Sequence, residues 1–175
     1  VRNAMNSGAY SRLALQNEGN WPLVSSNQDN GKYRRYAVTF VENHDTEVRP
    51  DGSSNGPLRK DTLAANAFLL AMPGTPCIFL KHWINCKRDI KAMIDVRNAV
   101  GLHNESSTLN MATNKDYYAV RTEGKDDKVL VAVVGKEAST YTPNGAYTCI
   151  LSGYHYAYWM SNNMETAWID LPSGE

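Results

Sequence analysis

The feature that most constrains the fold of this chain is an apolar stretch that ends abruptly in polar residues. From Tyr36 to Val41 the residues are mostly β-branched, aromatic or small, which is typical of a buried parallel strand. Glu42, Asn43, His44 and Asp45 follow at once. In α/β barrels the reactive side chains lie just past the carboxyl ends of the strands, where a ligand can approach. The pattern therefore predicts a catalytic edge at Asn43, His44 and Asp45.

The residues on either side of this stretch predict further helices and a second strand. A helix is expected from Val1 to Glu18, with Ser7-Gly8 as a point that divides it. A polar loop from Glu47 to Gly56 is expected to cover the catalytic edge. A helix from Pro57 to Met72 then leads to a short buried strand from Cys77 to Leu80, parallel to the first strand.

Beyond about Ser107 the apolar pattern changes from helical to strand periodicity. Short strands are predicted at Thr108–Met111, Tyr117–Arg121, Lys128–Val134, Ala146–Ser152, His155–Met160 and Thr166–Leu171. Turn-forming Asp, Gly and Asn residues separate them, as in an antiparallel sheet or sandwich. The domain boundary is therefore expected near Asn104 to Ser107.

Two segments resemble a known family. Phe40-Val41-Glu42-Asn43-His44-Asp45 is similar to the Phe-Val-Asp-Asn-His-Asp motif of the α-amylase family of glycoside hydrolases, at the end of the seventh strand of their (β/α)8 barrel. Met72 to Leu80 resembles the Pro-Gly-x-Pro turn before the eighth strand. The resemblance implies an α/β fold, a partial (β/α)8 (TIM) barrel of the last two strands with their helices in residues 1–105. An antiparallel β-sandwich domain would follow in residues 106–175.

The same resemblance implies roles for individual residues. Asp45 matches the family's carboxylate that stabilises the transition state, and His44 matches a residue that donates to hydroxyls of the same sugar. Asn43 is assigned either to sugar contact or to turn formation. His82 and Trp83, in the expected loop from Lys81 to Asn85, are candidates for a sugar subsite, with packing beneath the loop as the alternative for Trp83.

The family's nucleophilic Asp and general-acid Glu belong to motifs that do not occur in these 175 residues. A complete barrel needs about 250 residues, so the chain is interpreted as the C-terminal piece of an α-amylase-type glycosidase. It would be inactive alone, because glycoside hydrolysis needs two carboxyl groups. Asp45 and Glu47 share a strand face at roughly 6.5 to 7 Å, which is weak support for a carboxylate pair within the chain.

Three functions remain open from the sequence. The first is a hydrolase of α-1,4-linked starch-like glucans, with α-glucans or maltooligosaccharides as substrate. The second is a related glucanotransferase, and the third is a non-catalytic carbohydrate-binding or assembly module. Exposed barrel edges would lead the chain to self-associate or to bind the missing N-terminal barrel segment.

Composition excludes several other classes. Eighteen basic and 18 acidic residues balance, which argues against nucleic acid as a partner, and no apolar run is long enough to span a membrane. Three cysteines fit neither a disulfide framework nor a zinc site, and Cys77 is expected to be a small core residue. No metal or cofactor is assigned, with calcium a candidate only for the full-length parent. The resemblance implies a secreted, periplasmic or cell-surface location.

Overall fold

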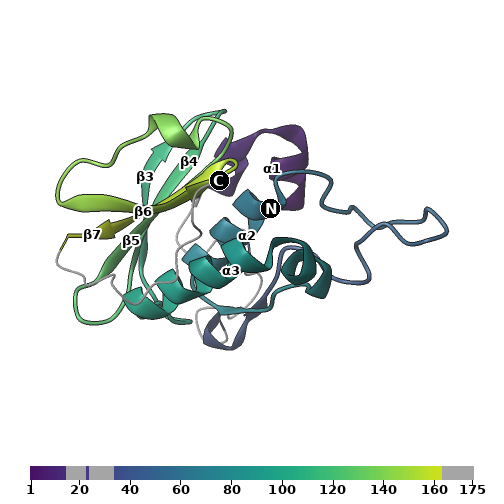
Figure 1. The fold of residues 1–175 in the computed structure, drawn as a ribbon, viewed down its shortest axis with the longest axis horizontal. Helices are drawn as coiled ribbons and strands as arrows, with labels where there is room; N and C mark the ends of the chain where they lie inside the picture. The colour runs from purple at the N-terminus through teal and green to yellow at the C-terminus, as the bar shows by residue number, and fades with distance from the viewer. Residues whose placement is uncertain (15–22, 24–33, 163–175) are drawn as a thin grey trace.

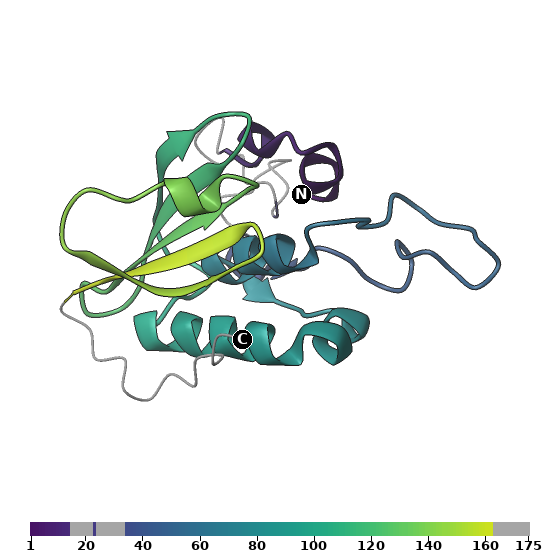
Figure 2. The ribbon, with the colours of Figure 1, turned by 45° about the horizontal axis from the view of Figure 1, so that its top comes forward.

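The computed structural model describes residues 1–14, 23 and 34–162. In this part of the chain, helix α2 (Thr62–Ala71) packs against a five-stranded sheet, and helix α3 (Leu80–Val100) packs against α2. Figure 2 shows the two helices on one side of the sheet, and the segment between β1 and α2 projecting away from the body. The layers are therefore sheet, α2 and α3 in that order.

A short parallel sheet links the two helices. Strand β1 (Val38–Thr39) pairs with β2 (Thr75–Pro76), with Val38 opposite Thr75 and Thr39 opposite Pro76. The expected β-α-β unit is therefore present, but β1 is shorter than predicted. The second strand was expected at Cys77–Leu80, whereas β2 lies just before that segment and ends at Pro76. Helix α2 is buried at every position from Ala64 to Ala71, which is what a helix without a polar face requires.

The C-terminal strands form one antiparallel sheet in the order β3-β4-β5-β7-β6. Its members are β3 (Thr108–Thr113), β4 (Tyr118–Glu123), β5 (Val129–Val134), β6 (Tyr147–Gly153) and β7 (Tyr156–Ser161). All six residues of β5 are buried, as its central place predicts. The antiparallel sheet expected beyond about Ser107 is thus observed in residues 108–161, whereas the strand expected at Thr166–Leu171 lies outside the described residues.

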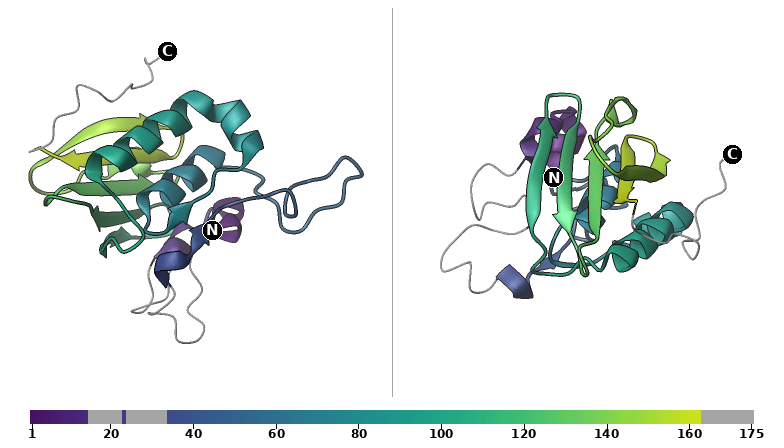
Figure 3. Two further views of the ribbon diagram at one scale, coloured as in Figure 1. Left: turned by 90° about the horizontal axis from the view of Figure 1, so that it is seen from below. Right: turned by 90° about the vertical axis from the view of Figure 1, so that its left-hand side faces the viewer.

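Figure 3 shows the helices packed beside the sheet, and the main hydrophobic core extends from the helices into the sheet. A smaller cluster includes Ala119, Val131 and Val133. The Tyr158 hydroxyl donates to the Ala67 carbonyl at 2.6 Å, and the Tyr156 hydroxyl donates to Asp89 at 3.3 Å. Burial raises the pKa of Tyr158 well above its usual value. These tyrosines join the sheet to both helices.

The N-terminal segment is divided at Gly8. Helix α1 (Arg2–Ser7) ends there in a left-handed conformation, and a 3-10 helix follows at Tyr10–Leu13. The Tyr10 hydroxyl donates to Asp61 at 2.5 Å, and the other carboxyl oxygen of Asp61 lies 2.7 Å from Nδ1 of His155. This buried carboxylate therefore connects the N-terminal segment, the start of α2 and the β6–β7 hairpin.

Two further local predictions are wrong. The segment Lys81–Asn85, expected to be a loop, is the first part of α3, which begins at Leu80. It is helical because no Gly or Pro interrupts residues 77–100. Cys77, expected in the core, is exposed, because β2 ends at Pro76 and the chain turns toward α3.

Within the described residues, no helix combines the length and the apolar character that a membrane span requires. 3-10 helices at Arg34–Tyr36 and Ala138–Thr140 complete the described elements.

Candidate active site

The polar residues after β1 form a tight turn organised by Asn43. Its side-chain Oδ1 accepts hydrogen bonds from the backbone N–H groups of Asp45 at 3.1 Å and Thr46 at 3.2 Å. The Asn43 carbonyl accepts from the N–H groups of Thr46 and Glu47, both at 3.1 Å. This Asx-type arrangement uses the Asn43 oxygen to shape the backbone, as the turn-forming alternative predicted.

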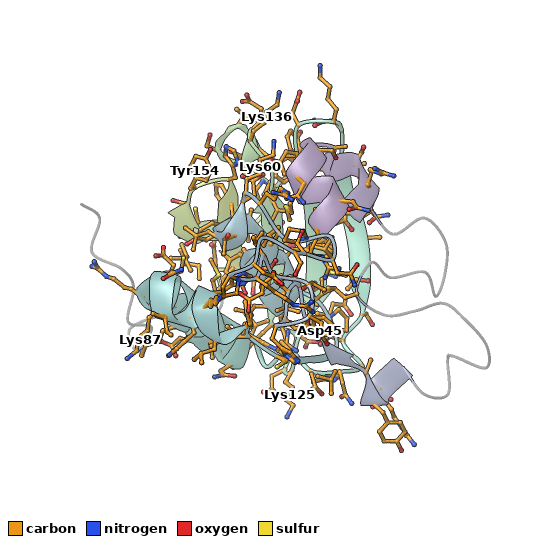
Figure 4. All side chains as sticks on the ribbon, turned by 90° about the vertical axis from the view of Figure 1, so that its right-hand side faces the viewer. Asp45, Lys60, Lys87, Lys125, Lys136 and Tyr154 are labelled. Atoms are coloured by element: carbon orange, nitrogen blue, oxygen red, sulfur yellow. The ribbon has the colours of Figure 1, made fainter. Side chains whose placement is uncertain are left out.

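The turn presents His44 and Asp45 to solvent. Their side chains are 81% and 64% exposed, and Nε2 of His44 lies 3.5 Å from Oδ1 of Asp45. Arg49 lies 4.0 Å from the same oxygen. Figure 4 shows Asp45 on the side of the molecule that carries the projecting loop, well separated from Tyr154 on the hairpin. An exposed imidazole, carboxylate and guanidinium in one turn can bind several sugar hydroxyls.

The loop that follows is closed by local contacts and by one link to α3. Oδ1 of Asp51 accepts from the backbone N–H of Ser53 at 2.9 Å and from its hydroxyl at 2.7 Å. These bonds lower the pKa of Asp51. Glu47 pairs with Lys81 in the first turn of α3, so this carboxylate is engaged away from Asp45.

His82 is buried and does not share the exposed surface that carries His44 and Asp45. It is 6% exposed, its Nε2 lies 3.0 Å from Oε2 of Glu42, and its Nδ1 lies 3.1 Å from Nδ2 of Asn66. Glu42 is also 6% exposed, and its second oxygen accepts from the Leu58 N–H at 2.5 Å. Both ring nitrogens of His82 are thus occupied by protein groups.

Trp83 is half-buried and packs on the edge of the main core. The ammonium of Lys87 lies 5.8 Å from the centre of its ring, within the range of a cation–π contact. The structure therefore shows Trp83 in the packing role, with part of its side chain still exposed.

The sequence missed the buried partners of the turn. Glu42 bonds to the Leu58 N–H and to His82, a contact between residues 40 apart that no local pattern indicates. Asn66 gave no signal, because an Asn at one position of an apolar helix is indistinguishable from a surface residue until the helix is known to be buried. Among the residues that the structure describes, no group of three His, Cys, Asp or Glu side chains could hold a metal ion.

The exposed polar turn follows a parallel strand pair in an α/β unit, and an antiparallel C-terminal sheet comes after that unit in the chain. No family model matches the sequence. The chain is 33% identical over 128 residues to the alpha-amylase type B isozyme of Hordeum vulgare, a match that covers 70% of this chain and 78% of that protein. This chain belongs to the α-amylase family.

Solved structures agree with this assignment at the level of the fold. The cyclomaltodextrin glucanotransferase CldA matches with a TM-score of 0.57 and 15% identity, over 79% of this chain and 39% of that one. AmyP in complex with maltotriose matches with a TM-score of 0.52 and 13% identity, over 78% of this chain and 41% of that one. The chain therefore spans about two fifths of the length of these enzymes.

Proposed function

We propose that this chain is the C-terminal part of an enzyme that cleaves α-1,4-glucosidic bonds in starch-like glucans. In this proposal β1 and β2 are the last two strands of a (β/α)8 barrel, and the five-stranded sheet belongs to the domain that follows it. The observation that carries the proposal is the Asn43-organised turn, which presents His44 and Asp45 side by side a few residues after the parallel strand β1. Membership of the α-amylase family and the maltotriose bound to AmyP support it.

Each residue of the turn has a distinct part in the proposed reaction. Asp45 accepts hydrogen bonds from sugar hydroxyls, and these bonds strengthen as positive charge develops on the distorted ring. His44 donates to a neighbouring hydroxyl, while Asn43 fixes the backbone between them. Such contacts accelerate the reaction only where they are stronger in the transition state than in the ground state.

The test is Asp45→Asn in the complete gene product, with kcat and KM measured on maltoheptaose. The amide keeps the shape of the side chain but loses its charge, so kcat is expected to fall by about 10³-fold or more, with a much smaller change in KM. Asp51→Asn is the matched control, because Asp51 belongs to the same loop and makes only local bonds to Ser53. A variant that changes KM alone would contradict the role of Asp45.

The chain alone is proposed to be inactive, because the nucleophile and the general acid would come from earlier barrel strands. Glu47 is occupied by Lys81, which weakens it as a second carboxylate for Asp45. Reducing-sugar release from maltoheptaose by the purified 175-residue chain checks this. Turnover that disappears in Glu47→Gln would show instead that the chain builds its own carboxylate pair.

A glucanotransferase remains a second candidate, favoured by the structural similarity to CldA. The two reactions differ in whether water or a sugar hydroxyl takes the glucosyl group. Product analysis of the complete gene product with a labelled maltose acceptor separates them. A role outside the cytoplasm and calcium dependence of the complete protein are part of the same proposal.

A further inference from the structure

A buried chain of three polar side chains begins at the residue that precedes the turn. Glu42 contacts His82, and His82 contacts Asn66, with none of the three more than 6% exposed. The three come from the segment that follows β1, from the first turn of α3 and from the interior of α2. The Leu58 N–H, just ahead of α2, adds a fourth segment through its bond to Glu42.

The hydrogen bonds define where the protons lie. Nδ2 of Asn66 donates one hydrogen to the Thr62 carbonyl at 2.8 Å and lies 3.1 Å from Nδ1 of His82. Because an amide nitrogen only donates, Nδ1 must accept, and the ring proton of neutral His82 must lie on Nε2. There it donates to Oε2 of Glu42 at 3.0 Å.

Such a chain is costly unless its geometry serves a purpose. Buried polar groups lower stability when they lack partners, and well-packed apolar residues of similar volume are often at least as stable. Oδ1 of Asn66 is buried without a hydrogen-bond partner among the described residues, so this chain carries such a cost. Here the Glu42 carboxylate accepts at both oxygens, and it is adjacent in sequence to Asn43. The bonds to Glu42 therefore hold the chain at the residue where the Asn43–Asp45 turn begins.

We propose that Glu42 and His82 are positioning residues that hold the Asn43–Asp45 turn in place for the sugar, with Asn66 fixing the proton of His82. Neither Glu42 nor His82 touches the substrate in this assignment. His82 is buried and acts on the site through its contact with Glu42. The catalytic consequence rests on the proposed function of Asp45, whereas the proton arrangement can be tested without it.

The informative variant is Glu42→Gln. A carboxylate accepts at both oxygens, but an amide has one acceptor and one donor end. In the variant, the new amide NH2 group then faces either the Leu58 N–H or the His82 Nε2–H, which is a donor against a donor. The second clash is relieved only if the His82 proton moves to Nδ1 and the Asn66 amide turns away from the Thr62 carbonyl. The turn is expected to shift in both cases.

The first measurement is nuclear magnetic resonance of the 175-residue chain labelled with ¹⁵N. We expect His82 to be protonated at Nε2 alone at neutral pH, and Glu42→Gln to displace the amide resonances of Asn43–Thr46. A proton on Nδ1 of His82 in the wild-type chain, or unchanged turn resonances in the variant, would overturn the proposal. These readouts do not depend on catalysis.

The second measurement is kinetics of the complete gene product on maltoheptaose. Glu42→Gln and His82→Leu are expected to lower kcat by about 10- to 100-fold, the range produced by small misplacement of a reacting group. His82→Gln should retain most of the activity, because its amide offers a donor toward Glu42 and an acceptor toward Asn66. Equal losses in His82→Gln and His82→Leu would overturn the positioning role.

Tyr158→Phe is the matched control for a general loss of stability. It removes a buried hydrogen bond to the Ala67 carbonyl, in the same core but without a link to the turn. For Tyr158→Phe we expect a fall in melting temperature comparable to that of Glu42→Gln, with kcat unchanged. A loss of kcat equal to that of Glu42→Gln would contradict the proposal. If the wild-type gene product does not act on α-glucans at all, the proposed function fails, and the turn resonances alone decide the positioning role.

Discussion

Gly74 stands at the closest approach between the end of the α2 segment and β1. Its φ is +116°, and a Cβ placed there would lie 2.6 Å from Cγ2 of Thr39. Thr39 is 1% exposed and belongs to β1, four residues before Asn43, where the candidate site begins. A side chain at Gly74 would therefore be strained by the positive φ and would also clash with Thr39.

We expect Gly74→Ala to lower the free energy of unfolding by about 2 to 4 kcal/mol, from the unfavourable φ together with overpacking against Thr39. Gly52→Ala is the control, because Gly52 has a φ of +82° but no atom within 4 Å of its Cβ position. That variant should lose only about 1 kcal/mol. Chemical denaturation measures both, and equal losses would show that Thr39 moves aside.

Arg97 connects the two helices at the level of secondary-structure elements. It is 6% exposed, and its guanidinium donates to the carbonyls of Leu70 and Met72, each at 2.7 Å, and of Gly74 at 2.9 Å. Burial lowers the pKa of Arg97. The side chain thereby satisfies carbonyls where α2 ends and stabilises the path of the chain into β2.

Arg97→Lys is expected to destabilise the protein by about 2 to 3 kcal/mol, because a single ammonium cannot span three carbonyls and charged hydrogen bonds are each worth about 1.5 to 3 kcal/mol. Lys91→Arg on the same helix is the control, since Lys91 lies at the surface and pairs with Asp95 at 2.8 Å. Thermal unfolding monitored by circular dichroism provides the comparison. An Arg97→Lys variant as stable as the control would show that the guanidinium bonds contribute little.

At this scale the sequence predicted the kind and order of elements better than their limits. Short runs of β-branched and aromatic residues between turn formers indicated all five described strands of the sheet, although burial does not alternate along β5, whose six residues are all buried. The loop predicted at Lys81–Asn85 was wrong because that prediction followed the strand–loop pattern of a barrel. The local composition, without Gly or Pro, favours a helix there. His82 was consequently placed on the rim, although its burial depends on Glu42 and Asn66, which are 40 and 16 residues away along the chain.

The candidate site was predictable only in part for the same reason. The turn residues Asn43, His44 and Asp45 are contiguous, so a short motif indicates them. Their support comes from α2 and α3, and no local pattern predicts which residues of two later helices reach one carboxylate. The position of the five-stranded sheet on α2 was likewise outside what periodicity alone could indicate.

On the scale of the whole molecule, one surface is left open beside β1. Val38 is 63% exposed and Phe40 41%, and among the described strands β1 pairs with β2 alone. A surface hollow of about 270 Å³ lies next to them, lined by Val1, Arg2, Asn3, Leu23, Val38, Phe40 and Val41. An apolar strand with one free edge is a template for pairing with another strand.

We therefore expect the 175-residue chain to self-associate through β1, with sedimentation velocity showing species larger than 19.5 kDa as concentration rises. Val38→Lys should shift the chain toward the monomer, because a charge on an exposed edge strand opposes pairing. Leu109→Lys is the control, since Leu109 is 56% exposed on β3, the edge of the other sheet. A monomeric wild-type chain, or an equal effect of both variants, would contradict this.

The same substitution should act in the opposite direction in the complete gene product. If an earlier barrel strand covers β1 there, Val38 is buried, and Val38→Lys places an unpaired ammonium in an apolar contact. We then expect a loss of several kcal/mol of stability, whereas Leu109→Lys remains neutral. If Val38→Lys makes the 175-residue chain monomeric but destabilises the complete protein, β1 normally has a neighbouring strand on both sides. If Val38→Lys has no effect on the complete protein, the barrel does not close at this edge.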